Sequence, residues 1–363
     1  MANIELATAS QKKVWTAKRY DEYVRASGFK PFMGKDSNKV IHVRYDLKTD
    51  RGDTINIPLF AKLKGEPKRG AAPIEGNEQG MANFHFPISI DWVGEGVSVS
   101  NSDQFRSEID LLEAGRAGLV NFMGEVTRND IIDALNSKNG IRFGDAGTAI
   151  RSAWSTANRD RILYGSKVSN HSDDFATAIS ALSEESDKLS PRIVQLARYL
   201  ARNADRVVRP AVVEERRGMS GERGNIVESY VMFVGGRSFF HLKQDQELRE
   251  DLRHAMDRGA KNPLFQPDDL MIDNVIVREI PEITERCLMA GQGYDGVDLE
   301  PFFLCGAQAI GYVVGQDPKF TADARDYGHV NGVAVRELRG IEKTQFAGVD
   351  HGVVTGYVAA PSA

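Results

Sequence analysis

The sequence is poor in cysteine, in long apolar runs and in charge of a single sign. Among its 363 residues it has two cysteines, Cys287 and Cys305, and neither has a second cysteine or a histidine at metal-site spacing. A disulfide between them stays open as an alternative, but reduced side chains in an apolar core fit their surroundings better. The sequence therefore gives no sign of an oxidising compartment.

No stretch reaches the roughly 20 apolar residues that a membrane-spanning helix needs. The N-terminal segment MANIELATASQKKVWTAKRY also lacks the apolar run of a signal peptide. The net charge is −5, with Lys and Arg spread along the whole chain. A protein that binds nucleic acid through its phosphates normally has a concentrated basic face, so we expect no specific nucleic-acid binding. These absences predict a protein that is made in the cytoplasm and has no membrane contact.

Two segments match enzyme motifs in their residue types but lack the structural context or the key residues of those motifs. Gly291–Gly296 (GQGYDG) matches a dinucleotide-binding fingerprint, but no strand-loop-helix unit frames it, so it is interpreted as a connection. Gly65–Gly70 has the glycine spacing of a phosphate-binding loop, yet Ala71 and Ala72 stand where Lys and Ser/Thr are required. The histidines are scattered, and no pair four residues apart accompanies a glutamate. We therefore predict no catalytic, cofactor-binding or metal-binding residues.

The composition itself is that of a globular protein, with 41% hydrophobic and 27% charged residues. The length suits about two compact units. Helical and strand-like patterns intermingle without a regular β-α-β rhythm, which favours an α+β fold over a doubly wound parallel sheet. Residues 230–234, 275–277 and 353–358 are predicted as strands, and the small-residue segment 303–314 is predicted as a helix.

Two strand-like runs dominate the first third of the chain. Residues 52–63 and 84–90, the second continuing through Val97 and Val99, alternate polar with apolar side chains. Each run contains a proline, which is typical of edge strands. A long linker rich in Gly, Pro and charge joins them, so we predict an extended hairpin. An isolated hairpin is only marginally stable in water, and we therefore expect this one to rest on a neighbouring subunit.

One long helix is predicted over 102–137, with a length of about 50 Å. Apolar residues recur along it at helical spacing. We expect six of them to pack, namely Phe105, Ile109, Leu112, Leu119, Met123 and Val126. The glycines Gly115, Gly118 and Gly124 each weaken a helix by up to about 1 kcal/mol, but they allow another backbone to approach closely. The pattern indicates a spine on which other elements pack.

The sequence contains, in this order, the segments FMG, GDTI, an L-x-G turn and EGNE, then NPLF, FLCGAQAIGYVVGQ and DYGHVNGVAVRELRGIEKTQFAGVDHGVVT. In these segments it resembles the N-four-like family of phage major capsid proteins. The segments follow in the family's order and cover about half of the chain, although 139–226 shows little of the pattern. The resemblance implies an α+β capsid protein fold of the Hong Kong 97 type, without enzymatic activity or a cofactor.

The resemblance also implies a division of the chain. The expected parts are an N-terminal arm over 1–50, an extended hairpin (E-loop) over 51–101, a peripheral domain over 102–150 with the spine helix 102–137, an axial domain over 151–325 with a candidate insertion at 160–226, and C-terminal strands over 326–363 that return to the peripheral domain. From the residues alone, a short helix packed on its own core explains the N-terminal segment equally well.

The implied function is assembly. We expect hexamers and pentamers of an icosahedral shell around the double-stranded DNA of a tailed phage, located in the virion and assembled in the bacterial cytoplasm. An encapsulin-like nanocompartment shell is the alternative. Expected partners are other copies of the chain, a separate scaffolding protein, a portal, decoration proteins and weakly, nonspecifically held DNA.

The hairpin tip is the expected contact between subunits. Its mixed charges suit complementary pairing that sets the register of neighbours, and the alternative is that they only keep an exposed loop soluble. The expected contact residues are Lys64, Glu66, Lys68, Arg69, Glu75, Asn77 and Glu78.

Overall fold

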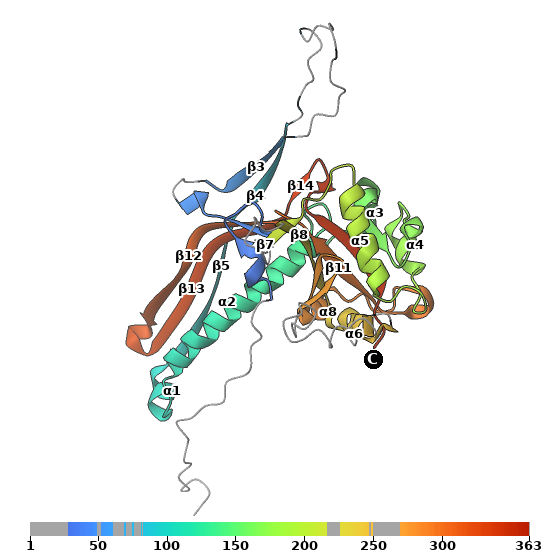
Figure 1. Cartoon of the computed structure of the whole chain (residues 1–363). Coiled ribbons are helices and arrows are strands. Elements are labelled where there is room, and N and C mark those ends of the chain that lie inside the picture. The colour runs from blue at the N-terminus through green and yellow to red at the C-terminus, as the bar shows by residue number, and fades with distance from the viewer. Residues whose placement is uncertain are drawn as a thin grey trace, which may run out of the picture. The chain divides into compact units, whose positions relative to one another are not determined.

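The computed structural model describes residues 28–48, 52–60, 69, 75, 81, 83–215, 226–246, 248–249 and 269–362. Helices and strands intermingle along the chain (Figure 1), which confirms the predicted α+β class. The chain divides into two units. The smaller unit includes Trp92–Thr127 and Gln316–Leu338, and the larger unit consists of Gly28–Asp91, Arg128–Gly315 and Arg339–Ala363.

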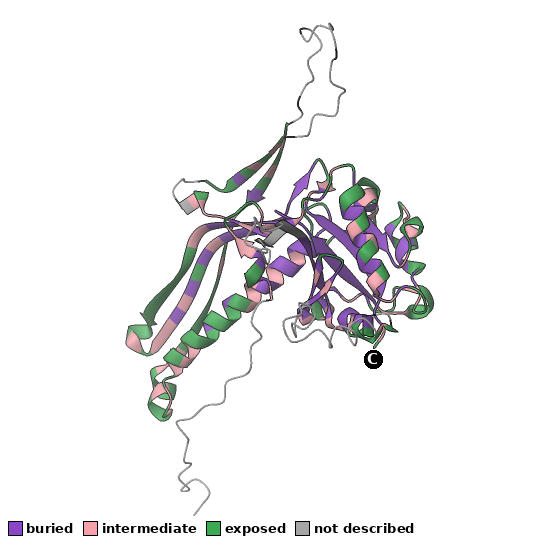
Figure 2. Cartoon of the chain, viewed as in Figure 1, coloured by how far each residue is buried: buried purple, intermediate pink, exposed green. Residues whose placement is uncertain are grey.

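A seven-stranded sheet forms the core of the larger unit. Its strands lie in the order β6 (Ile162–Tyr164), β16 (Val353–Ala359), β11 (Leu299–Cys305), β8 (Ile226–Val234), β10 (Val275–Glu279) and β9 (Asp269–Ile272), and β7 (Ala211–Glu215) also pairs with β8. The predicted strands 230–234, 275–277 and 353–358 are confirmed. Figure 2 shows the burial of the central strands, and β11 and β16 are buried along their whole length.

Successive side chains of each strand point to opposite faces of the sheet. Along β8, Met232 belongs to a core with helix α5 (Pro191–Asn203), whereas Phe233 belongs to a core with the last turns of helix α2 (Leu111–Asn136). Strands covered on both faces have nearly continuous apolar sequences. The sheet is therefore the middle layer of this unit.

The other helices of the larger unit lie around this sheet. They are α3 (Thr148–Ala157), α4 (Phe175–Ser180), α6 (Gly236–Gln244) and α8 (Pro281–Cys287), with 3-10 turns at Lys30–Phe32, Asp46–Lys48, Arg159–Arg161, Val168–Asn170 and Tyr294–Gly296. Residues 160–215, most of the candidate insertion, supply β6, α4, α5 and β7 to this unit. The remainder of that insertion, 216–225, lies outside the described residues.

The predicted helix over 303–314 is wrong. Its first residues end β11, and its last residues begin β12 (Ile310–Arg325), which pairs in parallel with β2 (Ile41–Arg44) next to β1 (Met33–Gly34). The physical reason is that a strand buried on both faces has the same unbroken apolar pattern as a buried helix.

In the smaller unit, β12, β13 (Val330–Lys343) and β5 (Asp91–Ser100) are neighbours in one sheet, and Asp326–Gly328 forms the turn between the first two. Leu119 and Met123 of α2 pack against Val333 and Val335 of β13. One face of the helix is therefore attached to the sheet.

The predicted continuous helix 102–137 is wrong at its start. A separate helix α1 (Asn101–Arg106) ends where Ser107 adopts an extended backbone conformation. The Oδ1 atom of Asp110 then accepts hydrogen bonds, at 3.0 and 3.2 Å, from the backbone N–H groups of the second and third residues of α2. Such side-chain bonds cap the start of a helix, so α2 begins separately from α1. Phe105, expected to pack, lies in α1 and is 94% exposed.

The grouping of the C-terminal segment also differs from the predicted division. Gln316–Leu338 groups with Trp92–Thr127, so the returning segment begins and ends earlier than the predicted 326–363. Residues 339–363 belong to the larger unit because they contain β16, which pairs with β11 on one side and with β6 on the other.

Candidate assembly surfaces

Strands β3 (Thr54–Phe60) and β4 (Asn83–Ser89) pair with each other in antiparallel register over their full lengths, which confirms the predicted hairpin. Pro58 lies opposite His85, and Pro87 lies opposite Asn56. These strands form a two-stranded sheet, so each proline lies on an edge strand, where its missing N–H is tolerated.

The hairpin is shorter than predicted. It ends at Ser89, whereas β5 belongs to the five-stranded sheet next to β13. Most of the predicted contact residues at its tip lie outside the described residues, namely Lys64, Glu66, Lys68, Asn77 and Glu78. Arg69 and Glu75 are described, and both are exposed.

The base of the hairpin is held tightly. Ile88 is fully buried in a cluster with Ile55 and Val313. The backbone N–H and Oγ of Ser89 donate hydrogen bonds to Oε1 of Glu342 at 3.3 and 3.2 Å. A Cβ atom on Gly340 would lie 2.0 Å from the carbonyl oxygen of Ser89, so only glycine allows this approach. The contacts fix where the hairpin leaves the larger unit.

Apolar side chains become exposed away from this base. Phe60, the last residue of β3, is 59% exposed, and Met81, just before β4, is 56% exposed. Exposed large apolar side chains are candidates for an interaction surface. Phe60 and Met81 therefore mark the described end of the two hairpin strands as a candidate contact.

Helix α2 also exposes two large apolar side chains. Val120 is 55% exposed and Phe122 is 43% exposed, although Leu119 and Met123, two of the predicted spine residues, are buried. The other predicted residues Ile109, Leu112 and Val126 are half-buried. Only one side of the helix is thus covered within the smaller unit.

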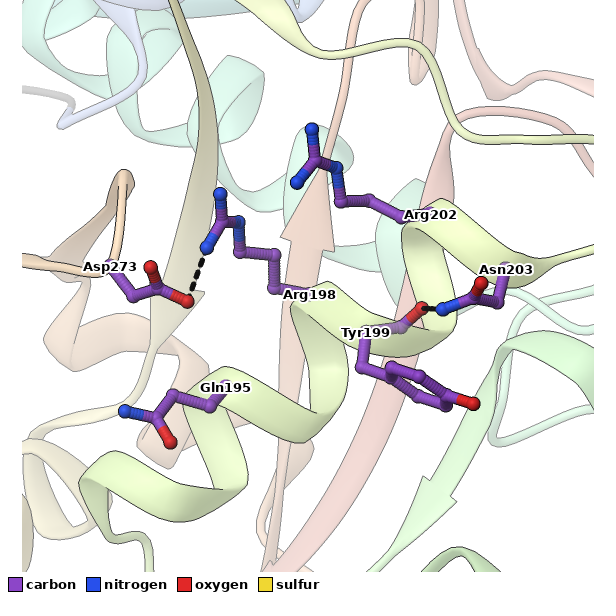
Figure 3. Close-up of a pocket in the computed structure, with 6 residues that line it drawn as sticks. All are labelled: Gln195, Arg198, Tyr199, Arg202, Asn203 and Asp273. Atoms are coloured by element: carbon purple, nitrogen blue, oxygen red, sulfur yellow. Dashed lines mark hydrogen bonds and ion pairs between the residues drawn. The ribbon is translucent and has the colours of Figure 1, made fainter.

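A polar hollow of about 430 Å³ lies on α5 in the larger unit (Figure 3). Arg198 forms an ion pair with Asp273, and the side-chain amide of Asn203 donates to the carbonyl oxygen of Tyr199 at 2.9 Å. Its lining is completed by Gln195 and Arg202. Ligand pockets are mostly apolar, so this lining suits a surface contact. The lining residues were not among the predicted site residues, although α5 contains three arginines and no acidic residue.

The most strongly perturbed amine lies in the core of the larger unit. Lys138 is fully buried, and its Nζ lies 3.8 Å from the centre of the Trp154 ring. Burial, followed by the nearby charge of Lys343, holds the pKa of Lys138 well below its usual value. A neutral amine resembles a catalytic lysine, but this one has no exposed surface from which to reach a substrate.

The described residues offer no metal site and no membrane span. Within them, no three His, Cys, Asp or Glu side chains are grouped to hold a metal ion, and no helix is long and apolar enough to cross a bilayer. Cys287 and Cys305 are free and buried, as favoured from the sequence, and burial raises the pKa of Cys287 to about 12. Gly291–Gly296 contains a 3-10 turn between α8 and β11, a connection as predicted.

The fold recurs in solved capsids. The chain matches the structure described as the cyanophage Pam1 capsid asymmetric unit with a TM-score of 0.89 and 34% identity, over 100% of both chains. It also matches the capsid of Ralstonia phage GP4, with a TM-score of 0.72 and 21% identity over 99% of both chains. These likenesses confirm the predicted Hong Kong 97-type capsid fold.

The sequence comparisons agree with this fold. The chain is 25% identical over 382 aligned positions to the major capsid protein of Pseudomonas phage KPP25, covering 99% of this chain and 97% of that relative. The family model described as phage capsid protein matches residues 3–362. Fold, relatives and family model agree, and the chain belongs to the phage capsid protein family.

Proposed function

We propose that many copies of this chain assemble into hexamers and pentamers, and that these close an icosahedral shell around the double-stranded DNA of a tailed phage. The observation that carries the proposal is the hairpin, which is fixed at its base by Ile88 and has the exposed apolar residues Phe60 and Met81 away from that base. Burying such residues against a neighbouring subunit stabilises association through the hydrophobic effect and needs no catalysed reaction. No enzymatic activity is part of the proposal.

The two units take different parts in the proposed shell. The smaller unit, with α2 as spine, corresponds to the peripheral domain, and the larger unit contains the axial domain and carries the hairpin. Head-to-tail contacts between unlike surfaces close into rings when the rotation permits. A hairpin lying across a neighbour adds to the roughly 1,600 Å² that a standard pair buries.

The proposed partners follow from the same role. They are other copies of the chain, a separate scaffolding protein, a portal and decoration proteins, with assembly in the bacterial cytoplasm. The net charge of −5 favours weak, nonspecific contact with packaged DNA, because like charges repel. The encapsulin-like alternative is disfavoured by the similarity to phage capsid proteins.

Electron microscopy and sedimentation of the purified chain, alone and with a scaffolding protein, test this function. Wild type should form capsomers or closed particles. Deleting residues 65–80, or replacing Phe60→Ser together with Met81→Ser, should leave the melting temperature of the free subunit unchanged while assembly falls. A matched control is Val168→Ser, since Val168 is 40% exposed on a 3-10 turn of the same unit.

Two results would contradict the proposal. A wild-type chain that stays monomeric at high concentration with scaffold present is not a shell subunit. A copurifying enzyme cargo in closed particles, without scaffold or DNA, would instead favour the nanocompartment. If the 65–80 deletion unfolds the subunit, the hairpin belongs to the core and its proposed role is wrong.

A further inference from the structure

Helix α5 has one basic, aromatic face that the proposed function leaves unexplained. Arg192, Gln195, Tyr199 and Arg202 recur at intervals of three and four residues, which places them on one side of a helix. All four are exposed, and Tyr199 is 59% exposed. The opposite side of the helix is packed into the core by Ile193, Val194, Ala197, Leu200 and Ala201.

The charges of this face are only partly balanced. Arg198, at its edge, is paired with Asp273. Within the described part of the chain, Arg192 and Arg202 form no ion pair, and in Figure 3 no dashed line reaches Arg202. The face therefore has an excess of guanidinium groups beside an exposed tyrosine.

An acidic surface lies elsewhere on the same unit, around helix α4. Asp173, Asp174, Glu184 and Glu185 are all exposed there. Asp174 is engaged in capping α4, where it accepts from the N–H of the third helical residue at 3.3 Å, and Glu184 is paired with Lys188 at 2.9 Å. Among described residues, Asp173 and Glu185 form no ion pair. In Figure 1, α4 lies to the right of α5 on the same unit.

We infer that the basic face of α5 docks against the acidic surface around α4 of a second copy of this chain. The inference rests on the proposed function and names one contact within a capsomer. A closed ring is built from contacts between two unlike surfaces of the same subunit, and the α5 face and the α4 surface carry opposite charge. The planar guanidinium group binds carboxylates through two parallel hydrogen bonds.

The composition of the face favours a protein partner over the phosphates of DNA. Tyrosine and arginine are the residue types that dominate binding energy at protein interfaces.

Charge reversal with rescue tests the contact. We compare wild type, Arg202→Glu, Glu185→Arg and the double variant by the protein concentration at which particles form. Each single reversal should raise that concentration about tenfold, because like charges meet across the interface, and the double variant should restore it. Lys319→Glu, on an exposed residue of β12, is the control, and Glu185→Arg should not correct any defect that it causes.

A disulfide cross-link reports the same contact directly. Arg202→Cys combined with Glu185→Cys should give a ladder of covalent oligomers after mild oxidation of assembled particles, whereas each single variant should not. The native cysteines are buried and free, so they add little background. Thermal unfolding of each variant subunit checks that it folds.

The outcomes separate this inference from the function on which it rests. Failure of wild type to form particles contradicts the proposed function. Normal assembly of Arg202→Glu, or a defect that Glu185→Arg does not rescue, overturns the docking surface alone. Loss of binding to a short DNA duplex with unchanged assembly would show that the face contacts DNA instead, and would also overturn it.

Discussion

The Nζ atom of Lys343 lies 2.8 Å from Oδ2 of Asp350, and the side chains are 0% and 1% exposed. Nε1 of Trp154 donates to the same carboxylate oxygen at 3.1 Å, and Nε2 of Gln345 donates to the other at 2.6 Å. A buried carboxylate that accepts several hydrogen bonds and lies next to one cation has its charge compensated. Asp350, in β15 (Val349–Asp350) opposite β14 (Gln345–Phe346), is therefore joined to the end of β13 by the ion pair and to α3 by the Trp154 hydrogen bond.

Breaking the Lys343–Asp350 pair should lower the free energy of unfolding far more than breaking an exposed ion pair. Lys343→Met should lower the free energy of unfolding of the free subunit by about 3–5 kcal/mol, because Asp350 is left as an uncompensated buried charge. Lys188→Met, which removes the exposed Lys188–Glu184 pair, should cost at most about 1 kcal/mol. Urea unfolding measures both. Equal losses of unfolding free energy in the two variants would mean that solvent reaches and stabilises the charge of Asp350.

The buried amine of Lys138 predicts a pH dependence of stability. Its pKa in the folded protein lies well below 10.5, so the unfolded chain binds more protons and stability rises with pH up to about 10.5. Lys138→Met should stabilise the subunit at neutral pH and flatten this rise. Unfolding curves of wild type and variant across pH give the difference. An unchanged slope would show that Lys138 stays charged in the core.

His351 predicts a loss of stability in acid. Burial, aided by the charges of Arg161 and Arg206, lowers its pKa from 6.5 to about 4. A base whose folded pKa is depressed loses stability as pH falls from 6.5 towards 4, because the unfolded state takes up the proton first. The loss should be roughly 3 kcal/mol at about 1.4 kcal/mol per pH unit. It should be absent from His351→Leu when acid unfolding of the two proteins is compared.

The glycines of α2 should be replaceable in the free subunit. A Cβ atom on Gly118 or Gly124 would have no atom within 4 Å, so Gly118→Ala and Gly124→Ala should each raise the unfolding free energy by about 0.5–1 kcal/mol. In contrast, a Cβ atom on Gly356 would lie 2.0 Å from Cζ of Phe302, and Gly356→Ala should destabilise by about 1–3 kcal/mol. Thermal unfolding distinguishes the two groups, and destabilisation by Gly118→Ala would contradict an open helix face.

Local patterns were sufficient for the hairpin and for part of the spine. Alternation and the prolines Pro58 and Pro87 predicted two edge strands because period-two burial is visible within a single strand. The spacing of Leu119 and Met123 likewise predicted a helix face that packs. The sequence also predicted that GQGYDG is a connection, because a phosphate-binding loop needs a strand before it and a helix after it, and the sequence does not supply them.

Other features depended on contacts between residues far apart in the chain. The residue pattern of 303–314 predicted a helix, whereas β11 pairs with β16 and β12 pairs with β2, so these residues contribute to two strands. The helix break near Asp110 was invisible because the apolar spacing continues across it. The hydrogen bond from Trp154 to the buried Asp350 joins residues 196 positions apart. Periodicity reports which side of an element is buried, whereas the partner that covers it is decided by tertiary packing.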